Sequence, residues 1–170
     1  IILVAVFCAV FAGLLSPHNP NALALSFAKK PPLSLDPQGG FYPLGTDALG
    51  RDILSRIFYG GRVSLTVGMA AVLLAGIIGV PLGLVAGYRG GLTDAVVMRL
   101  ADVQLAIPGL LLAIALISVI GSSLLGVIGI LGFTGWVGYA RIVRGQVLSV
   151  KQQPYVDAAR AAGASGGRIV

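Results

Sequence analysis

Two long runs without a charged residue are the feature that most constrains this chain. Residues 63–88 and 103–140 contain no Asp, Glu, Lys or Arg, which gives runs of 26 and 38 residues. A helix rises ~1.5 Å per residue, so about 20 apolar residues cross a hydrocarbon layer ~30 Å thick. The first run is long enough for one pass and the second for about two, with Gly121-Ser122-Ser123 supplying a turn near its middle. The sequence therefore predicts an all-α, polytopic helical membrane protein.

The overall composition excludes the main alternatives to a membrane protein. Only 11% of the residues are charged and the mean hydropathy is +0.95, whereas soluble domains carry about 25% charged residues. A soluble enzyme and a disordered chain are both excluded, because disorder needs low hydrophobicity and high charge. The net charge of +6 is not gathered into a patch, so we expect membrane lipid around the chain and no nucleic-acid partner.

The pattern of apolar, polar and Gly/Pro-rich stretches predicts the order of elements. The chain begins with Ile1 inside an apolar run, so we expect a fragment whose first helix is truncated. Residues 1–24 could instead be a signal peptide cleaved after Ala22-Leu23-Ala24, but the later apolar runs already commit the chain to the membrane. The expected elements are a truncated first helix ending near Leu15, an extramembrane segment 16–50, an interfacial helix Arg51–Arg62, helix two at Val63–Val85, a Gly-rich loop Tyr88–Asp94, helix three at Ala95–Ile120, helix four at Leu124–Val143 and a polar, helical tail to Val170. We group them as residues 1–62 and residues 63–170.

The distribution of basic residues gives an orientation. Residues 89–102 and 141–170 hold seven Lys or Arg, whereas residues 16–62 hold five together with three Asp. Positively charged loops are retained in the cytoplasm. We therefore place 89–102 and 141–170 in the cytoplasm and 16–62 outside.

Motifs for catalysis and metal binding are missing from the sequence. There is no G-x-x-x-x-G-K-[ST] phosphate loop, no H-E-x-x-H, no G-x-S-x-G and no cysteine cluster. We expect no catalytic residue, no metal and no cofactor bound by this chain, and we take His18 and Cys8 as incidental. Few charges lie deep in the helices, which disfavours a proton-coupled carrier.

Small residues recur at every fourth position of helix two. The stripe comprises Ala71, Ala75, Gly79, Gly83 and Gly87. Such stripes allow close helix packing in lipid.

Charged residues near the helix ends suggest local contacts. Arg99 and Asp102 have i, i+3 spacing at the start of helix three, which predicts either an exposed ion pair or a gating role. Thr46 and Asp47 are candidates for a helix N-cap. Arg51 and Asp52 could brace the start of helix two or dock an outside protein, and we prefer bracing.

The polar tail predicts a short helix and a turn. Pro154 suits a first helical turn, the following residues are rich in Ala, and Gly163 suits a C-terminal cap. We expect a helix over residues 154–162. By itself this pattern predicts no more than a surface helix.

Several motifs, taken in order, resemble one family. Asp-Ala-Ala-x-x-x-Gly at 157–163 is similar to the Glu-Ala-Ala-x-x-x-Gly loop of bacterial binding-protein-dependent ABC transporter permeases. The further motifs are PLGTDALGRDILSR at 43–56, YGGRVSL at 59–65, AGYRGG at 86–91, PGLLLAIA at 108–115 and WVGYAR at 136–141. Together they resemble the C-type permease subunit of the dipeptide/oligopeptide/nickel family, from residue 41 onward.

The resemblance implies a transport mechanism and its partners. It implies a type I ABC importer transmembrane fold, here incomplete with about four of six helices, in the bacterial inner membrane. The implied partners are a second, B-type permease subunit, two ATP-binding subunits that hold ATP and Mg²⁺, and an extracytoplasmic solute-binding protein.

The same resemblance assigns the loop at 154–165 to coupling. Its helix would seat in a cleft of an ATPase subunit, and the residues expected to act there are Tyr155, Asp157, Ala158, Ala159, Arg160 and Gly163. Asp157 stands where the family usually has Glu, one methylene longer. Peptides, glutathione-like compounds and nickel complexes are all candidate substrates, and a non-transporting membrane scaffold is the alternative function.

Overall fold

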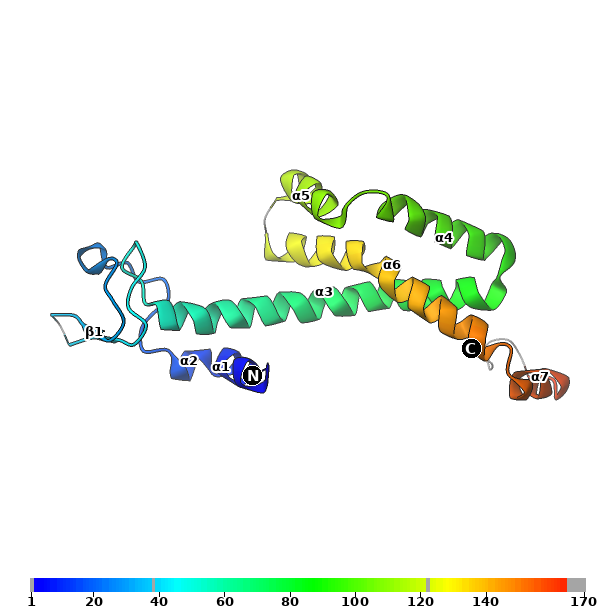
Figure 1. The fold of residues 1–170 in the computed structure, drawn as a ribbon, viewed down its shortest axis with the longest axis horizontal. Coiled ribbons are helices and arrows are strands. Elements are labelled where there is room, and N and C mark those ends of the chain that lie inside the picture. The colour runs from blue at the N-terminus through cyan, green and yellow to red at the C-terminus, as the bar shows by residue number, and fades with distance from the viewer. Residues whose placement is uncertain (1, 38, 122, 165–170) are drawn as a thin grey trace. The chain divides into compact units, whose positions relative to one another are not determined.

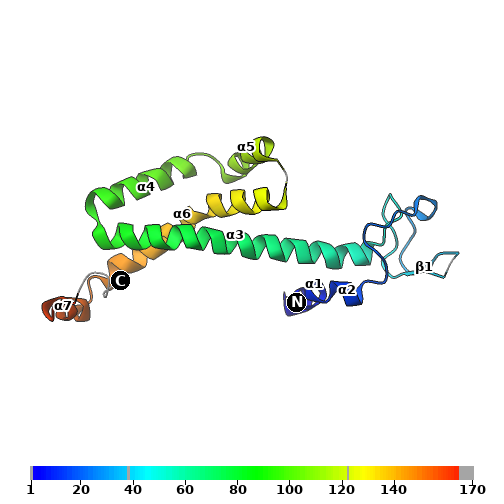
Figure 2. The same cartoon turned by 180° about the vertical axis from the view of Figure 1, so that it is seen from behind.

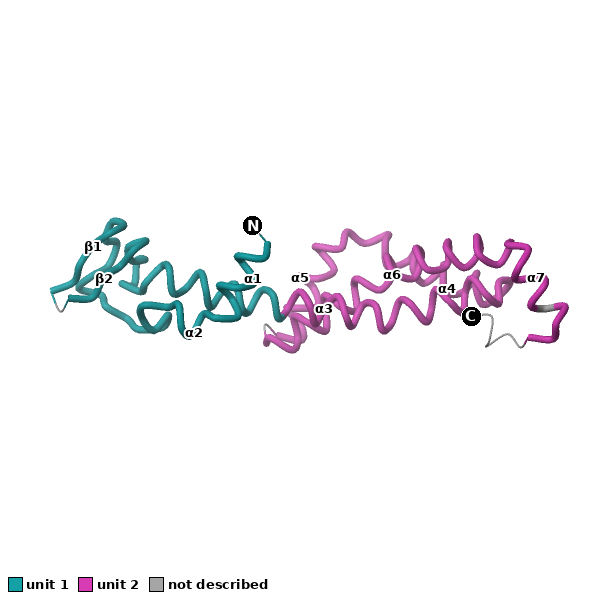
Figure 3. The backbone as a smooth tube through the Cα atoms, turned by 90° about the horizontal axis from the view of Figure 1, so that it is seen from below, with its two compact units in different colours: residues 1–66 teal, residues 67–170 magenta. Residues whose placement is uncertain are grey.

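The computed structural model describes residues 2–37, 39–121 and 123–164, except for the side chain of Arg160. The chain divides into two units, residues 1–66 and 67–170, which Figure 3 colours separately. The elements in Figure 1 are α1 (Ile2–Val10), α2 (Ala12–Leu15), the 3-10 turn η1 (Leu25–Phe27), β1 (Ser34–Leu35), β2 (Phe41–Tyr42), α3 (Ile53–Arg89), α4 (Gly91–Leu105), α5 (Gly109–Ile120), α6 (Leu124–Val150) and α7 (Pro154–Ala161).

The first unit contains the expected extramembrane segment between α2 and α3. Its two-residue strands β1 and β2 pair antiparallel, with Ser34 opposite Tyr42, and no strand was predicted there. Thr46 joins two parts of the segment, because its Oγ1 donates to the carbonyl of Phe27 and accepts from the amide of Lys30. The segment is irregular but held together by specific hydrogen bonds.

The start of α3 corrects the predicted cap. Asp52 holds this position: its carboxylate accepts from the amides of Leu54 and Ser55 at 3.3 and 3.1 Å. Thr46, one of the two predicted cap residues, instead bonds the backbone of the preceding loop at Phe27 and Lys30. Asp47 accepts from Arg51 and Arg56, which braces the segment just before the helix, as the preferred interpretation expected.

α3 is one helix where two were predicted. It has 37 residues and, at ~1.5 Å per residue, a length of about 56 Å. The predicted interfacial helix Arg51–Arg62 and helix two, Val63–Val85, are therefore parts of a single element that continues through Pro81. The charges before residue 63 mark the edge of the apolar run, but a helix does not stop where the hydrocarbon ends.

Helix three was also predicted wrongly, as a single element. α4 and α5 replace it, with a bend of 83° between them. Pro108 lies at this bend. Proline ends a helix because it lacks an amide donor and disfavours helical backbone in the residue before it. The predicted loop Tyr88–Asp94 is reduced to Gly90, whose φ of 66° is readily adopted by glycine.

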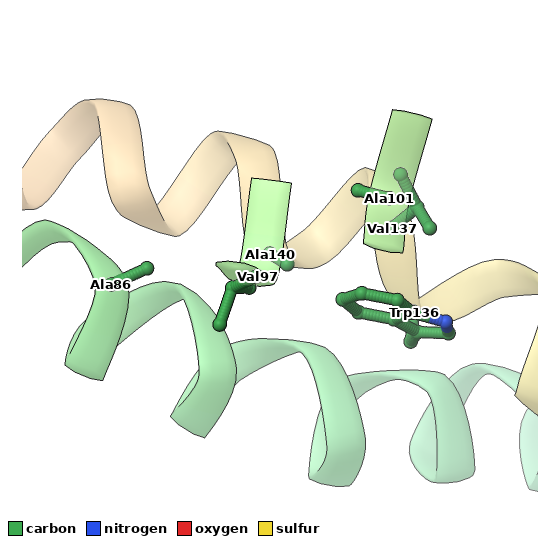
Figure 4. Close-up of a cluster of buried hydrophobic side chains, with 6 residues drawn as sticks. All are labelled: Ala86, Val97, Ala101, Trp136, Val137 and Ala140. Atoms are coloured by element: carbon green, nitrogen blue, oxygen red, sulfur yellow. The ribbon is translucent and has the colours of Figure 1, made fainter. Parts of the chain in front are cut away.

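α6 extends beyond its predicted end at Val143 to Val150. Among the described residues, α3 and α6 are long and apolar enough to span a membrane, and the bent α4–α5 pair could supply a third span. The core of the second unit lies where α3, α4 and α6 meet (Figure 4). It contains Ala86, Val97, Ala101, Trp136, Val137 and Ala140.

Candidate functional site

α7 is a short helix with a defined end. The amide of Ala164 donates to the carbonyl of Ala159 at 3.0 Å across Gly163, whose φ is 83°. This six-to-one hydrogen bond around a left-handed glycine is the Schellman arrangement that terminates helices. The predicted helix over 154–162 is therefore present, and Gly163 lies at the turn expected for it.

One side chain of α7 faces the membrane helices and its neighbour faces away. Val156 is 2% exposed and lines a cavity of about 230 Å³ with Leu84 and Tyr88 of α3 and Val143 and Val147 of α6. Tyr155 is 63% exposed. Val156 therefore anchors α7, while Tyr155 is available to another protein.

Lys151 ties the end of α6 to the end of α3. Its Nζ donates to the carbonyl of Tyr88 at 2.7 Å and lies 5.6 Å from the centre of the Tyr88 ring. A cation suits this place, because the last carbonyls of a helix lack partners and carry partial negative charge. Figures 1 and 2 both show α7 at the end of the second unit where α3 turns into α4.

The remaining residues predicted for the coupling loop lie on or beside α7. Asp157 and Ala158 are exposed and Ala159 is half-buried. The side chain of Arg160 and residue Ser165 lie outside the described part of the chain. α7 therefore presents Tyr155, Asp157 and Ala158 on an accessible surface.

The small-residue stripe of α3 is buried throughout, and its glycines lie against α6. A Cβ atom added to Gly83 would lie 2.5 Å from the carbonyl oxygen of Ala140, and one added to Gly87 would lie 2.8 Å from Cβ of Val147. Gly79 meets α6 in the same way at Trp136. Ala75 lies near Gly135, so four of the five stripe residues approach α6 closely, and Ala71 is buried.

Two ion pairs join α4 to α6. Asp94 in the first turn of α4 pairs with Arg144 through two hydrogen bonds, from Nε to Oδ1 and from Nη2 to Oδ2 at 2.6 Å. Asp102 pairs with Arg141. The predicted pair of Arg99 with Asp102 is thus corrected within the described chain: Arg99 is exposed, and Asp102 bonds across to the neighbouring helix.

A third polar contact closes the α4–α6 interface near the bend. Gln104 donates to the carbonyl of Thr134 at 2.7 Å and accepts from Trp136 Nε1 at 2.8 Å. The amide thereby satisfies both groups in a largely apolar setting, which matters because buried polar groups are costly when unpaired. α4 is held against α6 along its length.

The first unit has its own polar cluster at the start of α3. His18 stacks on Tyr42 with 4.3 Å between ring centres, and its Nδ1 lies 3.6 Å from Asp52 Oδ2. His18 is therefore part of the loop structure, and the expectation that it has no functional role stays a prediction. Burial opposes ionisation of Asp47, but hydrogen bonds from the amides of Arg51 and Leu49 and from the Arg51 and Arg56 side chains outweigh it and lower the pKa of Asp47.

The contacts described above connect α7 to α3 and α6, and α6 to α4. In the part of the chain that the structure describes, no three His, Cys, Asp or Glu side chains are placed to hold a metal ion. Sequence reasoning missed Val156, Lys151 and the Asp94–Arg144 pair. Val156 could have been noticed as an apolar residue inside a polar helix, and Asp94 and Arg144 as opposite charges on neighbouring helices. Spacing along the chain does not reveal which residues they contact.

Comparisons with known proteins agree with the geometry. The family described as "Binding-protein-dependent transport system inner membrane component" matches residues 79–170. The chain is 38% identical over 168 residues to the di/tripeptide transport system permease protein of Pseudomonas aeruginosa, covering 99% of this chain and 55% of that protein. It is 42% identical over 170 residues to the oligopeptide transport system permease protein of Bacillus subtilis, covering all of this chain and 54% of that one.

A third relative carries a different substrate in its name. The glutathione transport system permease protein of Pectobacterium atrosepticum is 45% identical over 127 residues, which are 75% of this chain and 42% of that protein. The chain spans about half the length of these relatives.

Proposed function

The chain belongs to the family of binding-protein-dependent transport system inner membrane components, and on that premise we propose that it serves as the C-type permease subunit of an ABC importer for peptides. It is a multi-pass protein of the bacterial inner membrane, in agreement with its apolar spans. The relatives named for peptide and glutathione transport favour a transport role over a non-transporting scaffold.

The observation that carries the proposal is the placement of α7. Its Val156 is buried against α3 and α6, while Tyr155 on the same helix is exposed. A helix anchored on one side and accessible on the other can pass the rigid-body motion of a partner to the helices that anchor it. We therefore assign α7, with Asp157, Ala158, Ala159, Arg160 and Gly163, to the docking of an ATP-binding subunit.

The other subunits of the importer are proposed as partners of this chain. A B-type permease subunit would complete the pathway, and two ATP-binding subunits would hold ATP and Mg²⁺ and hydrolyse the nucleotide. A solute-binding protein would deliver the substrate from outside. Di- and oligopeptides are the proposed substrates, with glutathione or a nickel complex as related small solutes.

The experiment measures ATP-driven uptake by the complete importer in proteoliposomes. The probes are tritiated alanyl-alanine, a labelled pentapeptide and labelled glutathione, each supplied with the cognate binding protein. Wild-type importer should accumulate at least one probe only when ATP is inside. Uptake of none of the three would contradict the proposed peptide and glutathione substrates, and uptake that does not need ATP would contradict the proposed ABC importer.

A variant of Gly163 tests the assignment of α7. Gly163→Val places a β-branched side chain at a φ of 83°, which is strained for any residue except glycine. Uptake should be lost while the subunit stays in the membrane at the normal level. Gly60→Val, in α3 where an added Cβ meets nothing within 4 Å, is the matched control and should retain uptake.

A further inference from the structure

We propose that Asp94 and Arg144 are positioning residues that carry the displacement of α7 and the end of α6 to α4. This inference rests on the proposed function, since it specifies how motion received at α7 reaches a further membrane helix. It concerns a pair that lies outside the coupling loop.

The contact itself fixes orientation as well as distance. The Arg144 guanidinium donates two parallel hydrogen bonds to the two carboxylate oxygens of Asp94, and such bidentate pairs are among the strongest and most directional in proteins. The two side chains are 32% and 20% exposed, against 46% and 57% for the Arg141–Asp102 pair. The Asp94–Arg144 pair is therefore the better shielded of the two from solvent.

Arg144 lies within the part of α6 that is locked to α3. Gly83 packs on Ala140 just before it and Gly87 packs on Val147 just after it. Four residues beyond Val147, Lys151 bonds to the end of α3. Displacement of α7 must therefore move this stretch of α6 as a body, and Arg144 moves with it.

Asp94 lies where α4 begins, four residues after the turn at Gly90. A carboxylate in the first turn of a helix is stabilised by the helix dipole, so its position on α4 is well defined. The far end of α4 is bound to α6 through Gln104 and Trp136. α4 is therefore bound to α6 near both of its ends, before the chain turns by 83° into α5.

The test is the amount of solute imported per ATP hydrolysed by the complete importer. The probe is whichever of alanyl-alanine, the pentapeptide or glutathione the wild type transports. In Asp94→Asn, ATP hydrolysis should persist while import per ATP falls on the order of fivefold or more, a size typical of coupling between sites. Asp102→Asn, which removes the exposed pair between the same two helices, is the matched control and should change the ratio by at most roughly twofold.

A charge swap separates positioning from a general structural role. Asp94→Arg combined with Arg144→Asp restores an ion pair between α4 and α6, so import per ATP should recover part of its loss, although the helix dipole disfavours a cation in the first turn of α4. An unchanged ratio in Asp94→Asn, equal losses in both Asn variants, or no recovery in the swap would overturn the proposal. If the wild type itself shows no ATP-driven uptake, the proposed function fails first and this inference with it.

Discussion

Replacing Gly83 by Ala tests whether α3 and α6 touch backbone to backbone. Gly83 is buried, and an added Cβ would lie 2.5 Å from the carbonyl oxygen and 3.0 Å from Cα of Ala140. Ordinary contact begins at 3.4 Å, so the new methyl group is about 0.9 Å too close to backbone atoms that have no rotamer to change. The two helices must separate.

The expected free energies oppose each other and can be separated by a control. Overpacking in a filled core costs about 1–3 kcal/mol, whereas Ala in place of Gly within a helix gains up to about 1 kcal/mol. Gly76→Ala in the same helix gives the gain alone, because an added Cβ there meets nothing within 4 Å. Gly83→Ala should therefore be less stable than Gly76→Ala by about 1–3 kcal/mol.

The assay is thermal unfolding of the complete subunit, purified in one detergent, for wild type and both variants. A change of about 1 kcal/mol shifts the Tm by about 2–4 °C for about 150–250 residues and by less for a longer chain. Gly76→Ala should unfold at or above the wild-type Tm and Gly83→Ala clearly below the Tm of Gly76→Ala. Equal rises in the two variants would refute the close approach of α3 and α6 at Gly83.

Three further predictions address other contacts. Val156→Ala should abolish most uptake and reduce stability by about 1–2 kcal/mol, measured by transport and unfolding, whereas Tyr155→Ala should reduce uptake without reducing the stability of the isolated subunit. Because the pKa of Asp47 is lowered in the folded protein, the stabilisation from its ionised carboxylate is complete above the ordinary carboxyl pKa of about 4 and is lost as the pH falls through the folded-state pKa. Proteolysis of segment 16–50 should therefore accelerate in acid. Asp47→Asn should accelerate this proteolysis at neutral pH and remove its dependence on pH. Gln104→Leu leaves Trp136 Nε1 without its acceptor and should destabilise the subunit by about 1–3 kcal/mol, with unchanged unfolding as the contrary result.

Local physical constraints made part of the fold predictable. The charge-free runs located the apolar parts of α3 and α6, because the cost of burying charge in hydrocarbon acts on each residue by itself. The ends of α7 were predictable for a similar reason, since proline restricts its own φ and glycine readily adopts a positive one: Gly163 has the positive φ that its place in the turn demands.

Long-range choices were not predictable from spacing. Asp102 has Arg99 three residues earlier, yet it pairs with Arg141, which is 39 residues away in sequence. An exposed i, i+3 pair gains only a few tenths of a kcal/mol, so packing of α4 on α6 decides the partner. The length of α3 was missed for a related reason, because the charges before residue 63 indicate the membrane edge and say nothing about where the helix ends.

Two carboxylates near the spans, Asp52 and Asp94, lie at helix starts. Asp52 caps α3 by accepting from backbone amides, whereas Asp94, in the first turn of α4, accepts from the Arg144 guanidinium. A short carboxylate at a helix start benefits from the dipole and loses little side-chain entropy. The apolar interior is held by close contacts such as Gly83 with Ala140, so charge is needed only where a helix end must be fixed to a neighbour. α7 follows such an end, since Lys151 at the end of α6 binds the carbonyl of Tyr88 near the end of α3 and Val147 packs on Gly87.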